Sequence, residues 1–228
     1  MSLIALRYLR FSWPGVAKPV LDIEKFDLRA GEKVMLRGPS GCGKSTLLSA
    51  IAGVIDVPKS SVQVAGVDVG GLSGSARDRF RVDHLGIIFQ VFNLLPWLSV
   101  IDNVVLPCRF SERRRENTGG DPVDTAARLL GDLGLMDPRM LKGPASALSI
   151  GQQQRVAAAR ALIGAPEIIL ADEPTSALDE DAKDAFVDLL LRECEGAGSS
   201  LLFVSHDRSL EKQFDRTEEL GNLNRGAA

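Results

Sequence analysis

The sequence predicts an α/β protein whose core is a mostly parallel β-sheet. In the last third of the chain, long apolar segments alternate with helical segments, a pattern typical of a parallel sheet covered on both faces. A glycine-rich loop joins an apolar strand to a helix near the start of the chain, and a second apolar strand, at 167–171, leads into two carboxylates. Ligands bind at the carboxyl ends of strands in open α/β folds, so we expect the functional site there.

The composition is that of a globular protein able to bury a sizeable core. Of its 228 residues, 45% are hydrophobic and 25% are charged, and the net charge is −3. Nucleic-acid-binding proteins usually have a basic excess, so we expect no nucleic-acid partner. The three cysteines, Cys42, Cys108 and Cys194, are odd in number and lack metal-ligand spacing, which favours a reducing compartment without disulfides.

The sequence predicts no segment that enters a membrane. Arg7 and Arg10 interrupt the apolar N-terminal run, unlike the uninterrupted core of a signal peptide. No stretch approaches the roughly 18 apolar residues that a spanning helix needs. We therefore expect a soluble protein that reaches a membrane only through a partner.

Strands and turns dominate the first third of the chain. We expect strands at 4–10, 26–28 and 33–37, and a helix at 45–52 with small and apolar residues on its buried side. Apolar and polar residues alternate over 61–69, which predicts one further strand.

The middle of the chain favours helices, expected at 100–107 and 123–133. The segment 111–120 between them is charged and ends in Thr-Gly-Gly, which predicts a mobile surface loop. Its arginines at 113–115 could bind lipid phosphates or RNA, but the flanking Glu112 and Glu116 favour a solvated run of charges.

The last third returns to alternating helices and strands. Helices expected at 151–163 and 182–194 precede buried strands at 167–171 and 200–205. Residues 222–228 are expected to fray.

Residues 38–46, Gly-Pro-Ser-Gly-Cys-Gly-Lys-Ser-Thr, match the phosphate-loop pattern between a strand and a helix. Glycines let backbone N–H groups converge on phosphate oxygens, and the helix N-terminus adds a partial positive charge. We expect Lys44 to reach the β- and γ-phosphates, Ser45 to bind Mg²⁺ and Cys42 to act as a small spacer. The expected nucleotide contacts are Gly38, Ser40, Gly41, Cys42, Gly43, Lys44, Ser45 and Thr46. Kinases, small GTPases and ATPases share this loop, so alone it predicts only a nucleoside triphosphate.

Two adjacent carboxylates, Asp172 and Glu173, end the apolar strand that begins near residue 167. We expect Asp172 to hold Mg²⁺, directly or through water, and Glu173 to polarise the water that attacks the γ-phosphate. The alternative role for such a pair is to cap a helix that follows the strand.

Residues 148–155, Leu-Ser-Ile-Gly-Gln-Gln-Gln-Arg, precede an alanine-rich helix and resemble the signature of ATP-binding-cassette (ABC) ATPases. The phosphate loop, Gln90, this signature, the carboxylate strand, residues 176–179 and His206 also follow the order of that family. The resemblance covers about residues 3–220. It implies a P-loop NTPase core with a mostly parallel sheet, an N-terminal antiparallel β subdomain and an inserted α-helical subdomain at about 91–150, all within a single domain over 1–228.

The signature departs from the family's commonest form, which has two glycines after the serine, because Ile150 replaces the first glycine. Ser149 and Gly151 are retained, so we expect function to survive with a stiffer loop. The resemblance implies that Ser149, Gly151 and Gln152 close over ATP held by a second copy of the chain. ATP would then hold two copies together in a head-to-tail dimer, and hydrolysis of the ATP would let the two copies separate.

The resemblance assigns further roles to single residues. His206 resembles the histidine that contacts the γ-phosphate, and Gln90 the glutamine that reaches Mg²⁺ and the attacking water. Asp179 resembles the aspartate that crosses the dimer interface. Trp13 matches the aromatic that stacks on adenine, although an aromatic residue there can equally be a packed turn residue. We interpret His84, Cys108 and Cys194 as structural.

The stretch after Gln90 has many large apolar residues, among them Leu94, Leu95 and Trp97. They either pack within the helical lobe or, as in transporters of the family, receive a short helix of a membrane permease. Three short segments resemble the subgroup that pairs with macrolide-exporter, lipoprotein-release or cell-division permeases. They are Phe-Asn-Leu-Leu-Pro at 92–96, Asp-Asn-Val at 102–104 and Gln-Gln-Gln-Arg-Val at 152–156. This implies a transport-coupled ATPase, peripheral at the cytoplasmic face of the inner membrane, that drives export or mechanotransmission. The alternative is a soluble ABC ATPase of translation or DNA repair, which would usually have two cassettes or a long coiled-coil insertion.

Overall fold

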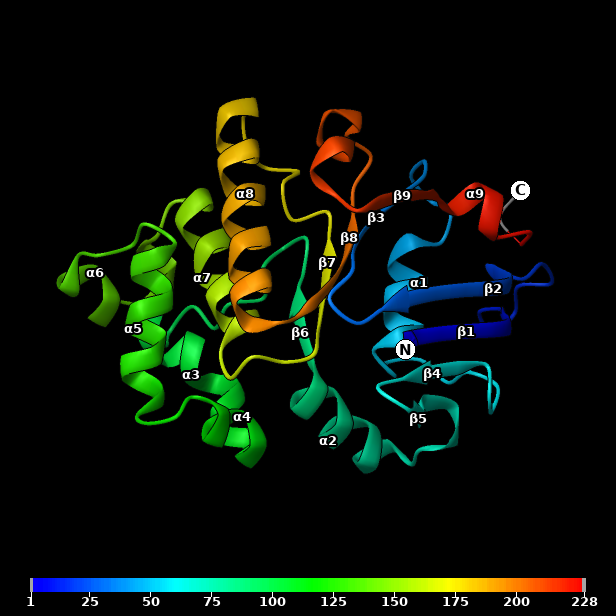
Figure 1. Ribbon diagram of the computed structural model, residues 1–228, viewed down its shortest axis with the longest axis horizontal. Coiled ribbons are helices and arrows are strands. Elements are labelled where there is room, and N and C mark those ends of the chain that lie inside the picture. The colour runs from blue at the N-terminus through cyan, green and yellow to red at the C-terminus, as the bar shows by residue number, and fades with distance from the viewer. Residues whose placement is uncertain (1, 227–228) are drawn as a thin grey trace.

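The computed structural model describes residues 2–226 and contains two β-sheets (Figure 1). The larger sheet is parallel, in the order β6–β7–β8–β3–β9, which confirms the predicted fold class. The smaller sheet is antiparallel, in the order β2–β1–β4–β5. The parallel strands are β3 (Lys33–Arg37), β6 (Leu85–Ile88), β7 (Ile168–Asp172), β8 (Ser200–Val204) and β9 (Arg216–Glu219); the antiparallel ones are β1 (Ser2–Phe11), β2 (Leu21–Arg29), β4 (Val62–Val64) and β5 (Val67–Asp68).

Helices cover both faces of the parallel sheet (Figure 1). Helix α1 (Lys44–Ile51) packs between the two sheets, and α7 (Ile150–Leu162) and α8 (Glu180–Ala197) cover the opposite face. The other helices are α2 (Gly74–His84), α3 (Val100–Phe110), α4 (Glu112–Asn117), α5 (Pro122–Asp132), α6 (Pro138–Lys142) and α9 (Leu220–Leu223). None of the helices within residues 2–226 is long and apolar enough to cross a membrane.

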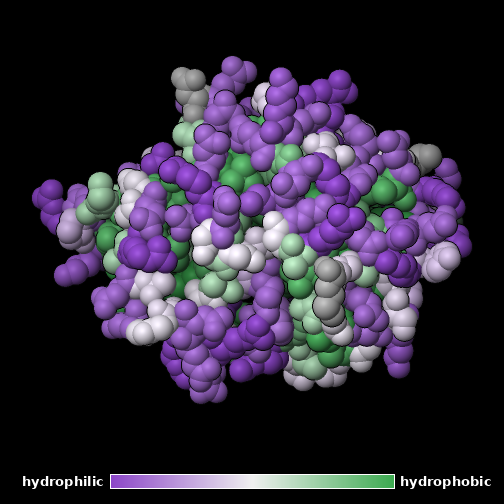
Figure 2. Space-filling model, in the orientation of Figure 1, coloured by the Kyte–Doolittle hydropathy of each residue, from purple (hydrophilic) through white to green (hydrophobic). Residues whose placement is uncertain are grey.

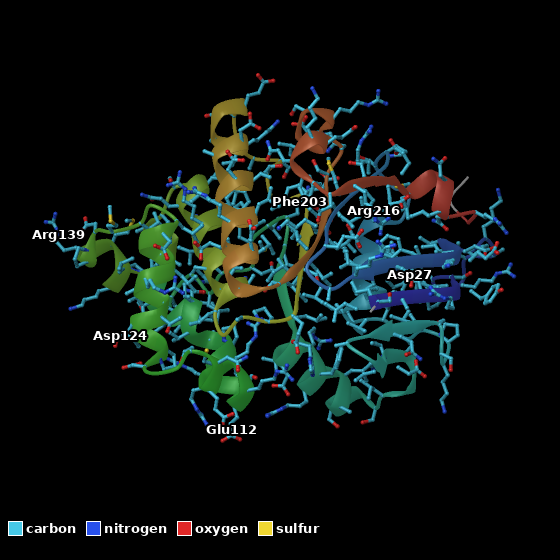
Figure 3. All side chains as sticks on the ribbon, viewed as in Figure 1. Asp27, Glu112, Asp124, Arg139, Phe203 and Arg216 are labelled. Carbon is cyan, nitrogen blue, oxygen red and sulfur yellow. The ribbon has the colours of Figure 1, made fainter. Side chains whose placement is uncertain are left out.

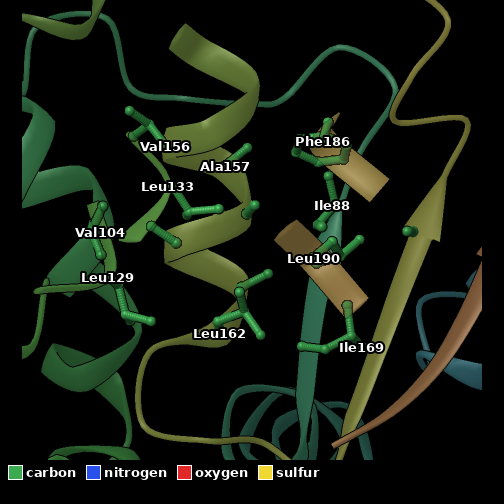
Figure 4. Close-up of a cluster of buried hydrophobic side chains, with 14 of the residues drawn as sticks. Ile88, Val104, Leu129, Leu133, Val156, Ala157, Leu162, Ile169, Phe186 and Leu190 are labelled. Carbon is green, nitrogen blue, oxygen red and sulfur yellow. The ribbon is translucent and has the colours of Figure 1, made fainter. Parts of the chain in front are cut away.

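The parallel strands alternate their side chains between two hydrophobic cores. Ile169 packs with Phe186 and Leu190 on the face covered by α7 and α8 (Figure 4). Leu170 and Leu202 point the other way, into the core shared by α1 and the antiparallel sheet. These strands lack a polar face because both of their faces are covered. The molecular surface seen in Figure 2 is, by contrast, mainly hydrophilic.

Arg216 on β9 links the parallel sheet to the antiparallel sheet (Figure 3). Its Nε lies 2.7 Å from Glu32 Oε1, and its Nη2 donates to the carbonyl oxygen of Asp27 on β2. Its guanidinium also lies 5.5 Å from the centre of the Phe26 ring. These contacts fix the two sheets relative to each other, and so fix what each contributes to a site between them.

The prediction of one strand over 61–69 is wrong. Two short strands, β4 and β5, form a hairpin there. The residues between them, Ala65 and Gly66, both have left-handed backbone angles, with φ values of 49° and 79°. Two such residues make the tight turn that matches the twist of a hairpin, so the alternating pattern spans a turn. Helix α2 and strand β6 were not predicted at all.

The prediction of a mobile loop at 111–120 is also wrong, because α4 occupies most of this segment. The Ser111 hydroxyl caps the helix by accepting a hydrogen bond from Arg114 N–H. Arg114 is only 1% exposed, and its Nη2 donates to Leu85 O at 3.0 Å and Ala161 O at 3.1 Å. Burial lowers the pKa of Arg114 to about 10. Arg113 and Arg115 are therefore the solvated members of the run, whereas Arg114 is buried and joins α4 to β6 and α7.

The expected fraying of 222–228 is wrong for the part that the structure describes. Asn224 is buried and forms an isolated bridge with Ile23 of β2. The last two residues of the predicted segment, 227–228, lie outside the described residues.

We expect Arg114→Ala to lower the free energy of unfolding by about 2–4 kcal/mol, because it leaves two buried carbonyl groups without their donor. Arg115→Ala in the same helix removes a half-exposed side chain and should change stability by no more than about 0.5 kcal/mol. Urea unfolding of both variants measures the difference. Equal midpoints for the two would contradict the structural role of Arg114.

Candidate nucleotide site

The phosphate loop lies between β3 and α1, at the carboxyl edge of the parallel sheet. Gly41 and Gly43 have φ values of 82° and 101°, in the left-handed region that favours glycine. A Cβ atom on Gly38 would lie 2.6 Å from Cys42 Sγ, so the loop closes tightly on the thiol. Cys42 is 8% exposed and fills the space expected of a small spacer.

Lys44, the first residue of α1, points back into the loop. Its Nζ donates to Gly38 O at 2.8 Å and Pro39 O at 3.0 Å, and lies 3.4 Å from Glu173 Oε1. The side chain is 6% exposed. The loop thus positions a buried ammonium group opposite the carboxylates that follow β7.

The two carboxylates have different surroundings. Burial raises the pKa of Asp172, the negative charge of Glu173 raises it further, and a hydrogen bond from Ser45 partly offsets the rise. Glu173 has a left-handed φ of 44°, and its N–H donates to Val204 O at 3.0 Å. A left-handed conformation is strained for glutamate, and in this conformation the carboxylate lies near both Lys44 and His206.

His206 follows β8 and approaches Glu173 from the other side. Its Nδ1 lies 3.2 Å from Glu173 Oε2, and its side chain is 67% exposed. The next residue, Asp207, accepts a hydrogen bond from Lys183 Nζ at 2.9 Å. Hydrogen bonds from Lys183 and Ser209 lower the pKa of Asp207 to about 2. The segment that follows β8 is therefore anchored to α8 through Asp207, while the His206 side chain stays accessible.

A cleft of about 450 Å³ brings most of the predicted residues together. Its lining includes Trp13, Val20, Ser40, Gly41, Gly43, Lys44, Ser45, Thr46, Gln90, Asp172 and Glu173. Gly38 and His206 line an adjoining hollow of about 290 Å³ with Arg37, Pro39, Arg208 and Glu219. Trp13 packs edge-on against Phe11 at 5.0 Å but remains 43% exposed, which leaves a face of the indole open to the cleft.

The remaining predicted residues line neither hollow: Cys42 is buried within the phosphate loop, and Ser149, Gly151, Gln152 and Asp179 lie elsewhere. Ser149 caps α7: its Oγ accepts from Gln152 N–H at 3.3 Å, and Gln152 Oε1 accepts from Ser149 N–H at 2.9 Å. Asp179 caps α8 by accepting from Ala182 N–H at 2.9 Å. Each therefore stabilises a helix N-terminus away from the phosphate loop of its own chain.

Two residues connect α7 to this site and were not predicted. Arg160 donates to Phe92 O at 2.5 Å and Asn93 O at 2.7 Å, just after Gln90. Gln154 is fully buried and donates to Pro174 O, next to Glu173. Their partners are backbone carbonyl groups of distant loops, and no residue pattern in the sequence indicates such contacts.

Because the pKa of Asp172 is raised in the folded state, its ionised form destabilises the nucleotide-free protein. We expect Asp172→Asn to increase the free energy of unfolding at neutral pH by on the order of 1 kcal/mol. The gain should shrink as pH falls through the folded-state pKa toward the ordinary value of 3.8. Urea unfolding at several pH values tests this, with the exposed Asp188→Asn as the control. A gain that does not depend on pH would contradict the assignment.

Comparisons with known proteins agree with this geometry. A family described as "ABC transporter" matches residues 21–176. The lipoprotein-releasing system ATP-binding protein LolD of Novosphingobium aromaticivorans is 42% identical over 95% of each chain. The macrolide export ATP-binding/permease protein MacB of Rhodopseudomonas palustris is 39% identical over 97% of this chain and 33% of that protein.

Solved structures show the same fold. A dimeric structure of the ATP-binding cassette MJ0796, in a post-hydrolysis state with ADP and phosphate, has a TM-score of 0.83 and 31% identity, covering 98% of this chain and 95% of that one. Another dimeric structure of MJ0796 has a TM-score of 0.82 and 32% identity, covering 95% of this chain and 93% of that one. The chain therefore belongs to the ABC transporter family, in which it is an ATP-binding and ATP-hydrolysing subunit of the type found in lipoprotein-releasing and macrolide-export systems.

Proposed function

We propose that MgATP binds in the cleft between the phosphate loop and the carboxylate pair, and that its hydrolysis drives a membrane permease on a separate chain. The observation that supports this most directly is the convergence of Lys44, Ser45, Asp172 and Glu173 on one cleft. Lys44 neutralises the β- and γ-phosphates, and the loop N–H groups and the N-terminus of α1 bind their oxygens. Trp13 stacks on the adenine.

The donor set of the cleft fits Mg²⁺. Ser45, Asp172 and Gln90 all line this cleft, so a hydroxyl, a carboxylate and an amide oxygen are available to one ion. Within residues 2–226 no cluster of three or more His, Cys, Asp or Glu side chains could hold a metal ion. A site with few protein oxygens suits Mg²⁺, which takes its other ligands from phosphates and water. The ion supplies neutralisation of the charge that develops during phosphoryl transfer.

Glu173 and His206 act on the reacting end of the nucleotide. Glu173 accepts a proton from the attacking water, and Gln90 orients that water. His206, 3.2 Å from Glu173, contacts the γ-phosphate and steadies the carboxylate. Lys44 Nζ lies 3.4 Å from Glu173 Oε1, so the cation that would bind the phosphates is next to the proposed general base.

A second copy of the chain completes each site. The signature lies outside the cleft of its own chain, and Ile150 at the start of α7 is 54% exposed. Ser149, Gly151 and Gln152 therefore meet a nucleotide only when another copy presents its phosphate loop, and Asp179 lies at the same junction. The dimeric state of the similar cassette MJ0796 supports this arrangement. A two-fold axis would produce two equivalent sites.

We expect Glu173→Gln to retain ATP binding and to reduce hydrolysis by at least about 100-fold, because it removes the general base. With MgATP this variant should elute as a dimer from gel filtration. Lys44→Ala should bind no ATP, and Glu195→Gln, an exposed site on α8, should behave like the unmodified protein. A Glu173→Gln protein that stays monomeric at micromolar concentration would count against the ATP-joined dimer.

An apolar groove supplies a docking surface for the permease. It has a volume of about 380 Å³, lies between α2, α3 and β6, and includes Phe89, Leu106, Pro107 and Phe110 in its lining. Phe110 is 65% exposed, more than a packed core residue would be.

Of the residues that the sequence predicted for docking, Leu94 packs against the hydrophobic core on the α7 and α8 face of the parallel sheet. Trp97 is exposed and does not line the groove. The relatives named for lipoprotein release and macrolide export support a permease of that kind. The subunit would then work at the cytoplasmic face of the inner membrane, in export or mechanotransmission.

We expect Phe110→Asp to abolish co-purification of a polytopic permease from detergent-solubilised membranes of the native host, because it places a charge in the apolar groove. Its ATP hydrolysis as an isolated subunit should be unchanged. Tyr8→Asp, at an exposed aromatic outside the groove, is the matched control. Recovery of the same permease by Phe110→Asp would exclude this groove, and recovery of ribosomes or repair factors would exclude a membrane partner.

A further inference from the structure

We infer that Asn224 is a positioning residue of the nucleotide site, which holds the phosphate loop against the opposite wall of the cleft. The side chain is 3% exposed. Its Nδ2 donates to Val20 O at 2.8 Å and Cys42 O at 3.2 Å, and its Oδ1 accepts from Asp22 N–H at 2.7 Å and Gly226 N–H at 3.1 Å. Two donated and two accepted bonds are all that an amide side chain can make in ordinary geometry.

One of these contacts lies at the base of the phosphate loop. The Cys42 carbonyl belongs to the peptide that leads into Gly43, whose left-handed φ of 101° starts α1. A Cβ atom on Gly43 would be in ordinary van der Waals contact with Asn224 Nδ2, at 3.5 Å, so the amide lies directly beside this residue. The direction of the Cys42 carbonyl fixes the plane of this peptide, and therefore the direction of the Gly43 N–H group next to Lys44.

A second contact lies on the facing wall. Val20 lines the cleft together with Trp13. The Val20 N–H donates to Phe11 O at 2.8 Å, and the Phe11 ring packs against Trp13. Through one amide group, Asn224 thus joins the peptide that shapes the phosphate end of the cleft to the strand ends that hold its aromatic end.

The backbone around Asn224 holds its side chain in place. Asn224 N–H donates to Leu220 O at 2.7 Å, and Arg225 N–H donates to Asp22 O at 2.9 Å. A Cβ atom on Gly226 would lie 2.6 Å from Pro19 O and 3.2 Å from Asp22 N, so the chain passes very close to the segment that leads into β2. A fully satisfied buried amide on a fixed backbone has one arrangement, and losing a donor leaves a buried carbonyl unpaired.

Asn224→Asp tests the inference, because aspartate keeps the shape of the side chain and lacks its two donors. Val20 O and Cys42 O would then face a carboxylate oxygen. Asn222→Asp makes the same chemical change at an exposed position two residues away. The Kd for MgATP, from calorimetry, should rise about tenfold for Asn224→Asp, the effect of roughly one lost buried hydrogen bond, and stay unchanged for Asn222→Asp.

Thermal unfolding separates positioning from simple stabilisation. Asn224→Asp should lower the Tm without nucleotide and also reduce the increase in Tm that saturating MgATP produces in the unmodified protein. A residue that only stabilises the fold would lower the first Tm and leave the ATP affinity as it was. That result would overturn the inference.

Hydrogen exchange on the Glu173→Gln protein tests the same idea with residue 224 intact, should Asn224→Asp fail to fold. MgATP should slow exchange in peptides covering 20–24 and 224–226 together with those covering the phosphate loop. Protection of the phosphate loop alone would overturn the role of Asn224.

The inference rests on the phosphate loop being the ATP site. If MgATP protects nothing at 38–46 in the Glu173→Gln protein, the proposed function and this inference both fail. If it protects the loop and Asn224→Asp binds ATP normally, only this inference fails.

Discussion

The whole structure depends on a parallel sheet that is buried on both faces. Strands β7 and β8 hold their hydrophobic side chains at 0% exposure, and these alternate between two cores. This burial keeps the carboxyl ends of β3, β7 and β8 side by side. The phosphate loop, the carboxylate pair and the His206 loop each begin at one of these ends. Packing in the interior of the sheet thus determines which charged groups meet at its edge.

Charge at that edge is only partly balanced within the chain. Lys44 is the one cation of the phosphate loop, and it lies against Glu173 and two loop carbonyls. Asp172 stays close to Glu173, and its pKa is raised by burial and by that neighbour. Such an arrangement costs stability without a ligand and favours a bound cation together with phosphate. The same crowding of carboxylates beside one lysine accounts for the raised pKa of Asp172 and for the proposed affinity of the cleft for MgATP.

The sequence was sufficient to predict the parts of the fold that depend on local patterns. The strand at Lys33–Arg37 has the predicted bounds, and α7, α8, β7 and β8 lie within a few residues of theirs. Of the predicted site residues, those next to the ends of β3 and β7 lie together, because strand order alone brings them to one edge. Residues such as Arg114, Arg160 and Asn224 could not be predicted. Most of their partners are backbone groups far away in the sequence, and a polar side chain gives no local indication of whether it will meet such a partner.

The strand order also determines when the protein can begin to work during its synthesis. β3, which leads into the phosphate loop, is made early, but both of its neighbours, β8 and β9, belong to the last part of the described chain. Contacts between segments so far apart form slowly, and the unpaired edges of β3 stay exposed until then. A nascent chain therefore contains the complete phosphate-loop sequence long before that loop has a rigid base. The rigid base of the nucleotide site can form only after β8 and β9 have been synthesised and have paired with β3.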